Sequence, residues 1–108
     1  RLTLPAETPR SYAYCSDTIY IPELSQYLQG VSLLFHEATF SQKDLARAKE
    51  TFHTTAEQAA TLAKNSLAQK LCIGHFSARY EDENVLLKEA QQVFNNTILA
   101  KENLTIKL

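Results

Sequence analysis

Residues 54–75 read TTAEQAATLAKNSLAQKLCIGH, and this stretch decides the predicted fold. It opens with two threonines, each followed three residues later by Glu or Gln, the pattern of a helical capping box. Alanine and leucine then recur at helical spacing, which predicts a helix over residues 56–66. Residues 70–74 form a short apolar run with polar neighbours, as in a buried strand. A helix that leads into a buried strand is one unit of an α/β layer.

Two more strands are predicted on the N-terminal side of this unit. Residues 11–15 are a β-rich run, and residues 31–35 are an apolar run that we expect to stop before His36. Between these strands Pro22 opens a short helix, because proline is tolerated in a first turn. Gly30 stands where a helix C-cap favours a residue that can take positive φ.

Two more helices are predicted, one on each side of the central unit. Ser41 is the expected N-cap of a helix that runs to about residue 50. Asp82 is expected to cap a last helix. The apolar stripe of that helix consists of Val85, Leu86, Leu87, Ala90, Val93 and Phe94. Residues 97–99 and 104–108 are then predicted to form a terminal hairpin or two edge strands.

The alternation of strand and helix predicts a single α/β segment over residues 1–108, with residues 1–10 as an extended lead-in. Right-handed crossovers would cover the sheet with helices. In open α/β sheets, ligands bind at the ends of the strands, and several polar residues of this chain follow predicted strands. The residues expected at that edge are Asp17, His36, Glu37 and His75.

Composition and charge limit the class of protein. The chain has 44% apolar and 21% charged residues and only two glycines, the profile of a globular chain rich in regular structure. A formal net charge of −1 gives no overall attraction to nucleic acid, so any RNA contact must be local. No apolar run is long enough to span a bilayer. Because the chain begins with Arg1 and lacks methionine, we expect it to be a piece of a longer protein.

The two cysteines bear on the compartment. Cys15 and Cys72 both have apolar neighbours in the sequence, where buried reduced thiols are expected. A disulfide would suit a secreted protein, but no other feature of the sequence favours that compartment. A cytoplasmic location is therefore predicted.

Four residues offer groups that can bind a metal or move a proton. Asp17 and His75 follow predicted strands and carry the oxygen and imidazole nitrogen that zinc binds. Taken singly, Asp17 is typical of a turn and His75 of a hydrogen-bonded core histidine. His53 lies just ahead of a helix, where an imidazole can exchange a proton, and Glu37 is the carboxylate expected to orient it. The alternatives are a helix-flanking histidine and a solvated loop acid.

Four short strings follow one another in a distinctive order: SDT at residues 16–18, HEATF at 36–40, HTTA at 53–56 and HFSARY at 75–80. Each lies after a predicted strand or before a predicted helix. In this order they resemble ribonuclease Z, the tRNA 3′-endonuclease of the metallo-β-lactamase superfamily. The resemblance covers residues 11–99, nearly the whole chain.

The resemblance implies a fold and a metal site. The chain would be the C-terminal half of a metallo-β-lactamase-like αββα sandwich. The complete active site of the family holds two zinc ions, and Asp17 matches the aspartate that bridges them. His75 matches the histidine that completes the second ion. Glu37 and His53 match the catalytic pair that supports proton transfer at the scissile phosphate.

The resemblance also implies an activity. The full-length parent would be a hydrolase, an endoribonuclease that removes the 3′ trailer of precursor tRNA. Arg79 and Ser77 are the expected substrate-binding residues, since the planar fork of an arginine suits phosphate. An ion pair with the acidic residues 81–83 is the alternative role for Arg79.

Two departures from the family pattern matter. Members usually carry Gly-His-Ser where this chain has Phe52-His53-Thr54, and the hydroxyl is kept. The His-x-His-x-Asp-His motif of the family, which holds most metal ligands, is absent among three widely spaced histidines. We therefore expect the chain alone to bind zinc weakly, to be inactive, to require the missing N-terminal half and to self-associate as a homo-oligomer such as a homodimer.

Two other functions fit parts of the sequence. One is another hydrolase of the same superfamily, a phosphodiesterase or an arylsulfatase-like enzyme, which would share the metal ligands without needing RNA. The other is a metal-free α/β assembly module whose polar residues at strand ends only cap loops. Metal analysis of the full-length parent separates the second from both enzymes.

Overall fold

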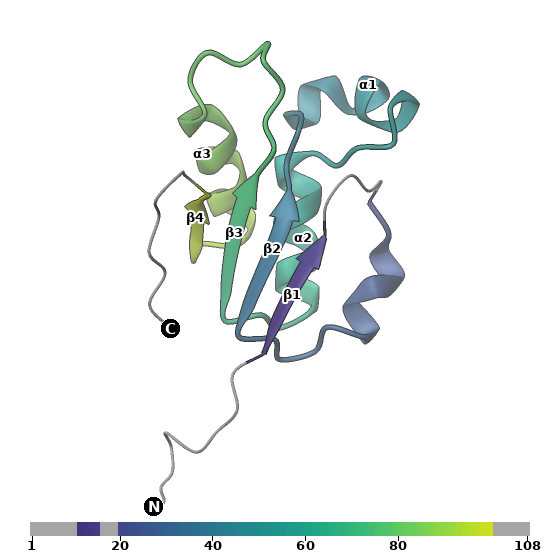
Figure 1. Cartoon of the computed structure of the whole chain (residues 1–108), viewed down its shortest axis with the longest axis vertical. Helices are drawn as coiled ribbons and strands as arrows, with labels where there is room; N and C mark the ends of the chain where they lie inside the picture. Colours follow the sequence, from purple (N-terminus) through teal and green to yellow (C-terminus); the bar gives the residue numbers. More distant parts are fainter. Residues whose placement is uncertain (1–10, 16–19, 101–108) are drawn as a thin grey trace, which may run out of the picture.

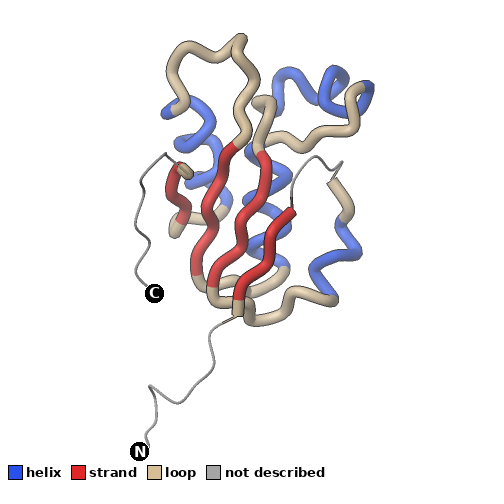
Figure 2. Tube along the Cα trace, in the orientation of Figure 1, coloured by secondary structure: helices blue, strands red, loops and turns tan. Residues whose placement is uncertain are grey.

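The structure is a computed structural model that describes residues 11–15 and 20–100. Four parallel strands form one sheet in the order β1-β2-β3-β4 (Figures 1 and 2). The strands are β1 (Tyr12–Cys15), β2 (Leu33–Glu37), β3 (Lys70–Gly74) and β4 (Thr97–Leu99). Because all four run the same way, their carboxyl ends share one edge of the sheet. The predicted α/β class is confirmed.

The helical segments connect successive strands. They are the 3-10 helices η2 (Pro22–Gln26) and η3 (Gln42–Asp44) and the α-helices α1 (Leu45–Glu50), α2 (Ala56–Asn65) and α3 (Asn84–Val93). Helices α2 and α3 pack side by side on one face of the sheet, behind it in Figure 1. The short helix α1 stands above the carboxyl edge of the strands. Its connection to α2 therefore passes close to the ends of β2 and β3.

The hydrophobic core lies between the sheet and helices α2 and α3. Helix α2 contributes several fully buried alanines, whose small side chains let the helix approach the sheet closely. The larger buried side chains come mainly from the strands and the two helices: Leu34, Leu62, Leu71, Ile73 and Leu86. This core fixes β2 and β3, the two strands that carry the polar residues at the edge.

A capping box starts helix α2, as the sequence predicted, and Thr55 is the N-cap. The Thr55 hydroxyl accepts from the backbone N–H of Gln58 at 3.1 Å, and the Gln58 side chain accepts from the Thr55 N–H at 3.0 Å. Two N–H groups that a helix start leaves unpaired are thus satisfied. The cap anchors the helix directly after His53 and Thr54.

A Schellman turn ends helix α2 and places a leucine in a left-handed conformation. Ala68 donates its N–H to the Ala63 carbonyl at 3.1 Å, and Leu67 donates to Lys64 at 3.2 Å, the two bonds of this motif. Leu67 has a φ of 56° and a side chain that is mostly exposed. A residue with a Cβ is disfavoured in this region, so Leu67 costs stability at a position that suits glycine.

Leu67→Gly in the full-length protein is expected to raise the free energy of unfolding by about 0.5–1 kcal/mol. The change removes the strain of a Cβ in the left-handed region, and the greater backbone freedom of glycine in the unfolded chain offsets part of that gain. A thermal melt measures the change as a higher midpoint. Leu67→Ala is the matched control and is expected to stay near the wild type, because alanine keeps the Cβ. A lower midpoint for the glycine variant would contradict this account of the turn.

The second strand differs from its prediction. Strand β2 begins at Leu33 and includes His36 and Glu37, whereas the sequence predicted a strand over residues 31–35. The prediction placed charged residues outside the strand because they are usually exposed. Here Glu37 pairs with Gly74 in the ladder, and the following residue, Ala38, donates to the Gly74 carbonyl at 2.8 Å.

Smaller differences concern the caps. The Ser41 side chain makes no capping bond at η3, and Asp82 accepts from Asn84 N–H at 2.9 Å although Glu83 is the residue before α3. Gly30 has the expected positive φ of 73° but lies beyond the end of η2, and its N–H donates to the carbonyl of Ser66. Its N–H thus satisfies one carbonyl at the end of helix α2, and Gly30 does not cap η2.

Some predictions fall outside the described residues. The lead-in over residues 1–10 and the edge strand over residues 104–108 are among them. Residues 97–99 do form an edge strand, which pairs in parallel with β3. Among the described residues, no helix is long and apolar enough to cross a membrane.

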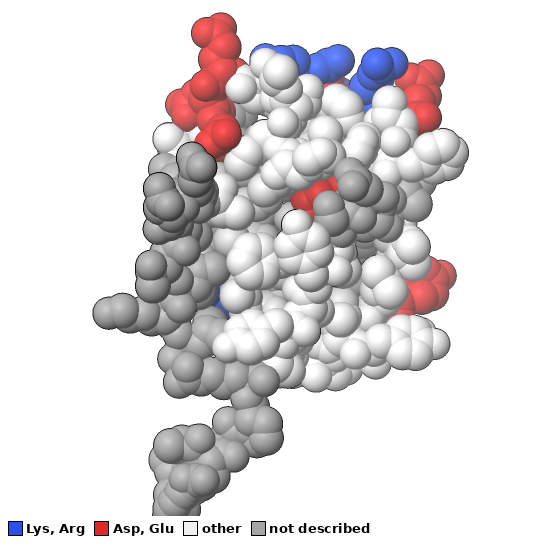
Figure 3. Space-filling view, viewed as in Figure 1, with Lys and Arg blue, Asp and Glu red and all other residues white. Residues whose placement is uncertain are grey.

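The face of the sheet opposite helices α2 and α3 carries aromatic side chains. Tyr12 and Tyr14 are 62% and 76% exposed, and the rings of Tyr14 and Phe35 lie 5.7 Å apart. Figure 3 shows this face as largely uncharged, with most charged side chains along its upper rim, a small acidic patch near its centre and another at its lower right. Exposed rings on neighbouring strands are typical of a surface that another element covers.

The two cysteines lie on β1 and β3, with β2 between them, and both are free. Cys72 is fully buried, as predicted, while Cys15 is half-buried. Burial raises the pKa of the Cys72 thiol to about 11. It also raises the pKa of Cys15. Both thiols are therefore protonated and unreactive at neutral pH.

Candidate active site

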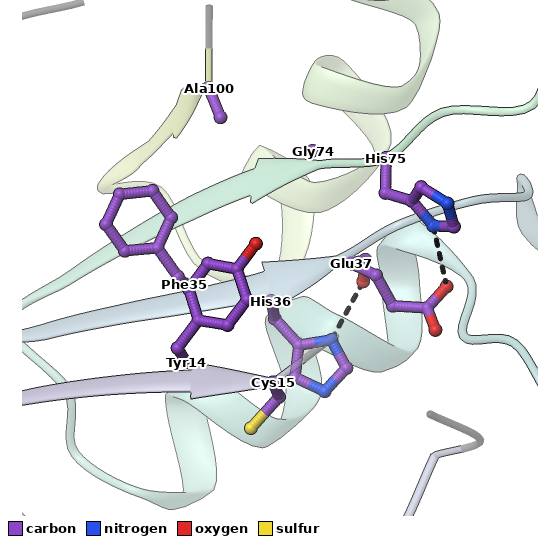
Figure 4. Close-up of a pocket in the computed structure, with 8 residues that line it drawn as sticks. All are labelled: Tyr14, Cys15, Phe35, His36, Glu37, Gly74, His75 and Ala100. Carbon is purple, nitrogen blue, oxygen red and sulfur yellow. Dashed lines mark hydrogen bonds and ion pairs between the residues drawn. The ribbon is translucent and has the colours of Figure 1, made fainter. Parts of the chain in front are cut away.

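A pocket of about 140 Å³ opens at the carboxyl edge of the sheet (Figure 4). It is lined by residues in the carboxyl-terminal halves of the strands or just after them: Tyr14, Cys15, Phe35, His36, Glu37, Gly74, His75 and Ala100. The pocket therefore lies at the carboxyl edge of the sheet, where the sequence predicted His36, Glu37 and His75. Asp17 lies outside the described residues.

Glu37 is the buried centre of this edge, with a side chain that is 0% exposed. Its carboxylate lies 3.0 and 3.1 Å from Nδ1 of His53 and accepts a hydrogen bond from the Thr39 hydroxyl. The backbone N–H of Thr54 also donates to it, at 3.3 Å. A buried carboxylate is stable only with such partners, so the loops that carry them must fold around Glu37.

His53 lies on the connector between α1 and α2, and its ring contacts Glu37 as the sequence led us to expect, while its catalytic role stays a prediction. Its backbone N–H donates to the Ala48 carbonyl at 2.8 Å, and its ring meets the edge of Phe40 at 6.2 Å between centroids. Phe52 precedes it with a φ of 59°. A glycine, which the resemblance implies at this position, would take that conformation without strain. Phe52 therefore carries a backbone cost here.

His75 follows β3 directly and turns towards Glu37. Its Nδ1 lies 3.2 Å from the Thr39 hydroxyl and 4.0 Å from the Glu37 carboxylate, and its side chain is about half exposed. Because the two imidazole nitrogens lie on opposite sides of the ring, Nε2 points away from Glu37, as Figure 4 shows. Gly74 allows β3 and Ala100 to approach closely, because a Cβ at position 74 would lie 3.2 Å from the Cβ of Ala100.

The three side chains form a compact group of metal-binding type. Glu37, His53 and His75 each offer a ligand atom, and these atoms lie within 4.8 Å of one another. The rings of His53 and His75 are 5.4 Å apart between centroids. Imidazole and carboxylate are ligands that zinc accepts, so the donor set fits a metal at this edge.

His36, the other polar residue of the strand end, is buried. Its Nδ1 donates to the Glu37 carbonyl at 2.8 Å, and within the described part of the chain its Nε2 has no hydrogen-bond partner. Burial lowers the pKa of His36, and the Glu37 carbonyl and carboxylate offset this only in part. The imidazole is thus neutral at pH 7 and serves the packing of the edge.

Arg79 and Ser77 lie on the loop after His75. Arg79 pairs with Asp44 at 3.4 Å and stands over the Phe40 ring at 5.4 Å, so its ion pair is not with residues 81–83. The Ser77 hydroxyl accepts from Arg79 N–H at 3.3 Å. Both side chains therefore have roles in shaping this loop, and their contact with substrate stays a prediction.

Two further residues hold the loops together, and although both lie inside the strings HEATF and HFSARY, neither was assigned a role of its own from the sequence. The hydroxyl of Tyr80 donates to Asp44 and accepts from Ser41 N–H at 2.8 Å, and burial raises its pKa, with the Asp44 bond adding to the effect. Thr39 contacts Glu37 and both histidine rings. Neither residue type carries a sequence signal of its own, because threonine and tyrosine are common in loops.

Comparison with solved structures identifies the fold. The metallo-β-lactamase fold protein YhfI from Bacillus subtilis matches 84% of this chain with a TM-score of 0.77 at 24% identity, over 37% of its own length. Human tRNase Z, short form (ELAC1), matches 77% of this chain with a TM-score of 0.60 at 31% identity, over 27% of its own length. The chain therefore has the fold of part of a metallo-β-lactamase-type protein.

Sequence relatives identify the family within this class. A ribonuclease Z of Bacteroides fragilis (strain YCH46) is 67% identical and one of Phocaeicola vulgatus 59% identical, each over 108 residues and 100% of this chain. One of Porphyromonas gingivalis (strain W83) is 55% identical over 99% of the chain. The chain belongs to the ribonuclease Z family, although no protein-family model matches it. It spans only about a third of the length of these relatives, 35–36%.

Proposed function

We propose that the full-length parent of this chain is a zinc-dependent endoribonuclease that removes the 3′ trailer of precursor tRNA by phosphodiester hydrolysis. The names of the relatives and of the human structure, tRNase Z, support the substrate. The observation that carries the chemistry is the buried pairing of Glu37 with His53, set beside His75 at one edge of the sheet. Three elements far apart in sequence converge there.

The metal ligands of this chain are proposed to be His75 and Asp17. His75 fits, because its Nδ1 faces Thr39 and Glu37 while its other nitrogen points away from them. A histidine that ligates zinc through one nitrogen commonly donates its other N–H to a protein oxygen. Two zinc ions, when bound, would lower the pKa of a water and neutralise charge on the phosphate. Two ligands are too few for a stable site, so the rest of the parent must supply others.

His53 is proposed as the general acid. Glu37 accepts from the Nδ1–H of His53 and orients the ring, so that the opposite nitrogen can give a proton to the leaving ribose oxygen. Glu37 does this without leaving its own buried position.

Arg79 and Ser77 are proposed to meet a substrate phosphate at the mouth of the site. The guanidinium of Arg79 is about half exposed, and its contact with Asp44 is a partly solvated ion pair that stabilises little. A phosphate offers Arg79 two oxygens in the geometry that suits its planar fork. Exchange of Asp44 for phosphate is thus the proposed event when RNA binds.

The rest of the parent is proposed to cover the exposed aromatic face. Tyr12, Tyr14 and Phe35 form an apolar surface on the sheet, as expected of the inner face of an αββα sandwich. Without that cover, the isolated 108-residue chain is proposed to self-associate and to be inactive. The parent itself is proposed to act in the cytoplasm as a homodimer.

Chelation of the full-length protein is the experiment that tests the function. Cleavage of a precursor tRNA at the start of its 3′ trailer is expected, with loss of cleavage after metal removal and recovery on adding zinc. Gel analysis of end-labelled RNA reads the position of the cut. Cleavage only of a small phosphodiester, with no cut in the precursor, would favour another hydrolase of the superfamily. Activity that survives complete metal removal would refute the metal-dependent mechanism.

A further inference from the structure

Thr39 bonds to both histidine-bearing loops through its backbone. Its N–H donates to the carbonyl of Thr54 at 3.0 Å, next to His53, and its carbonyl accepts from Ser77 N–H at 2.9 Å, two residues after His75. Thr39 is 7% exposed and follows strand β2 by two residues. Its side chain is therefore held at a fixed point between the two loops.

The Thr39 hydroxyl lies among three groups. It donates to the Glu37 carboxylate, and its oxygen lies 3.2 Å from Nδ1 of His75 and 3.4 Å from Nδ1 of His53. A hydroxyl has one hydrogen and two lone pairs, and a carboxylate can only accept. Because the single hydrogen of Thr39 goes to Glu37, the contact with His75 requires that Nδ1 of His75 carry the hydrogen.

We propose that Thr39 is a positioning residue that fixes the tautomer of His75, so that its Nε2 presents a lone pair towards the metal site. Glu37 fixes His53 in the same tautomer, with the hydrogen on Nδ1. The same carboxylate oxygen of Glu37 accepts from the Thr39 hydroxyl, so the two histidines are connected through Thr39 and Glu37. The inference rests on the proposed function for its metal, but the tautomer is a property of this chain. Outer-shell partners of this type typically contribute 10–100-fold to metal affinity or activity.

The test uses Thr39→Val, which keeps the branched shape and both backbone bonds but removes the hydroxyl, and Thr39→Ser, which keeps the hydroxyl. The full-length protein, labelled with ¹⁵N-histidine and freed of metal, is compared by NMR above the ordinary imidazole pKa. Histidine signals are assigned from their loss in H53Q and H75Q. Zinc affinity is measured in parallel with a competing chelator.

The wild type and Thr39→Ser are expected to show His75 with its hydrogen on Nδ1, whereas Thr39→Val is expected to populate the other tautomer. Zinc affinity should fall roughly 10–100-fold in Thr39→Val and recover in Thr39→Ser. An unchanged His75 tautomer with unchanged zinc affinity in Thr39→Val would overturn the proposal. Equal loss in both variants would also overturn it, because a retained hydroxyl would then fail to preserve the tautomer and the zinc affinity.

Two controls keep the result decisive. If Thr39→Val does not fold, Thr39→Ala replaces it, and a thermal melt of each variant checks folding. The NMR and zinc measurements need no RNA. A parent that cuts no precursor tRNA would thus refute the proposed function while the tautomer of His75 still decides the role of Thr39.

Discussion

Replacing Asp17 by alanine in the full-length protein is expected to remove bound zinc and RNA cleavage together. Strand β1 ends two residues before Asp17, at the edge that holds Glu37 and His75. A carboxylate shared by two metal ions offsets the charge of both, so its loss weakens both sites. The effect should exceed the roughly 10–100-fold cost of losing an outer-shell partner. Metal analysis after dialysis and a single-turnover cleavage assay measure the two losses.

Asp82→Ala is the matched control for this variant. Asp82 is exposed, and the hydrogen bond that the structure gives it is to the N–H of Asn84 at the start of α3. Its replacement is expected to leave zinc content and cleavage at the wild-type level. Full zinc content in Asp17→Ala would show that the aspartate is not a metal ligand.

The order of strands and helices could be predicted from the sequence because the chain keeps local signals consistent with its fold. Strand β3 was predicted at its observed bounds, residues 70–74, because a short apolar run between polar residues is typical of a buried strand. The sequence offered a capping box at either Thr54 or Thr55 for the start of helix α2, and the structure has it at Thr55. Both signals involve only residues that are close together in the sequence, so they can be recognised without the structure.

The end of strand β2 shows where local signals fail. A pattern that places charged residues outside strands assigns Glu37 to a loop, yet its side chain is fully buried. The carboxylate is tolerated because His53, Thr39 and Thr54 surround it, and two of these come from a connector some sixteen residues away in the chain. Burial of this charge is a tertiary effect, so no window of sequence contains it.

Thr39 and Tyr80 illustrate a second limit. Each acts through a hydroxyl that joins two loops, and neither has a spacing that distinguishes it from an ordinary loop residue. The motif strings singled out the residues that carry charge or bind metal, because those have distinctive chemistry. The groups that position them became visible only when the loops after β2 and β3 were seen in contact.

Replacing His53 by alanine is expected to slow the chemical step of cleavage by roughly 10²-fold or more while the zinc content stays unchanged, as for the loss of a general acid. Its Nδ1 is held by Glu37 at 3.0 Å, which orients the ring as that role requires. Single-turnover cleavage under saturating enzyme isolates the chemical step. Glu37→Gln, which keeps the shape of the side chain, should slow the same step.

The double variant of His53 and Glu37 tests whether the two residues act as one unit. If Glu37 acts through His53, combining Glu37→Gln with His53→Ala should cost little more than His53→Ala alone, since catalytic units are strongly non-additive. Zinc content separates a general-acid role of His53 from a role as metal ligand. The second role is the alternative because Glu37, His53 and His75 offer three donor atoms within 4.8 Å of one another. Loss of zinc in His53→Ala would make His53 a ligand, and an unchanged rate would leave it only a structural bond to Glu37.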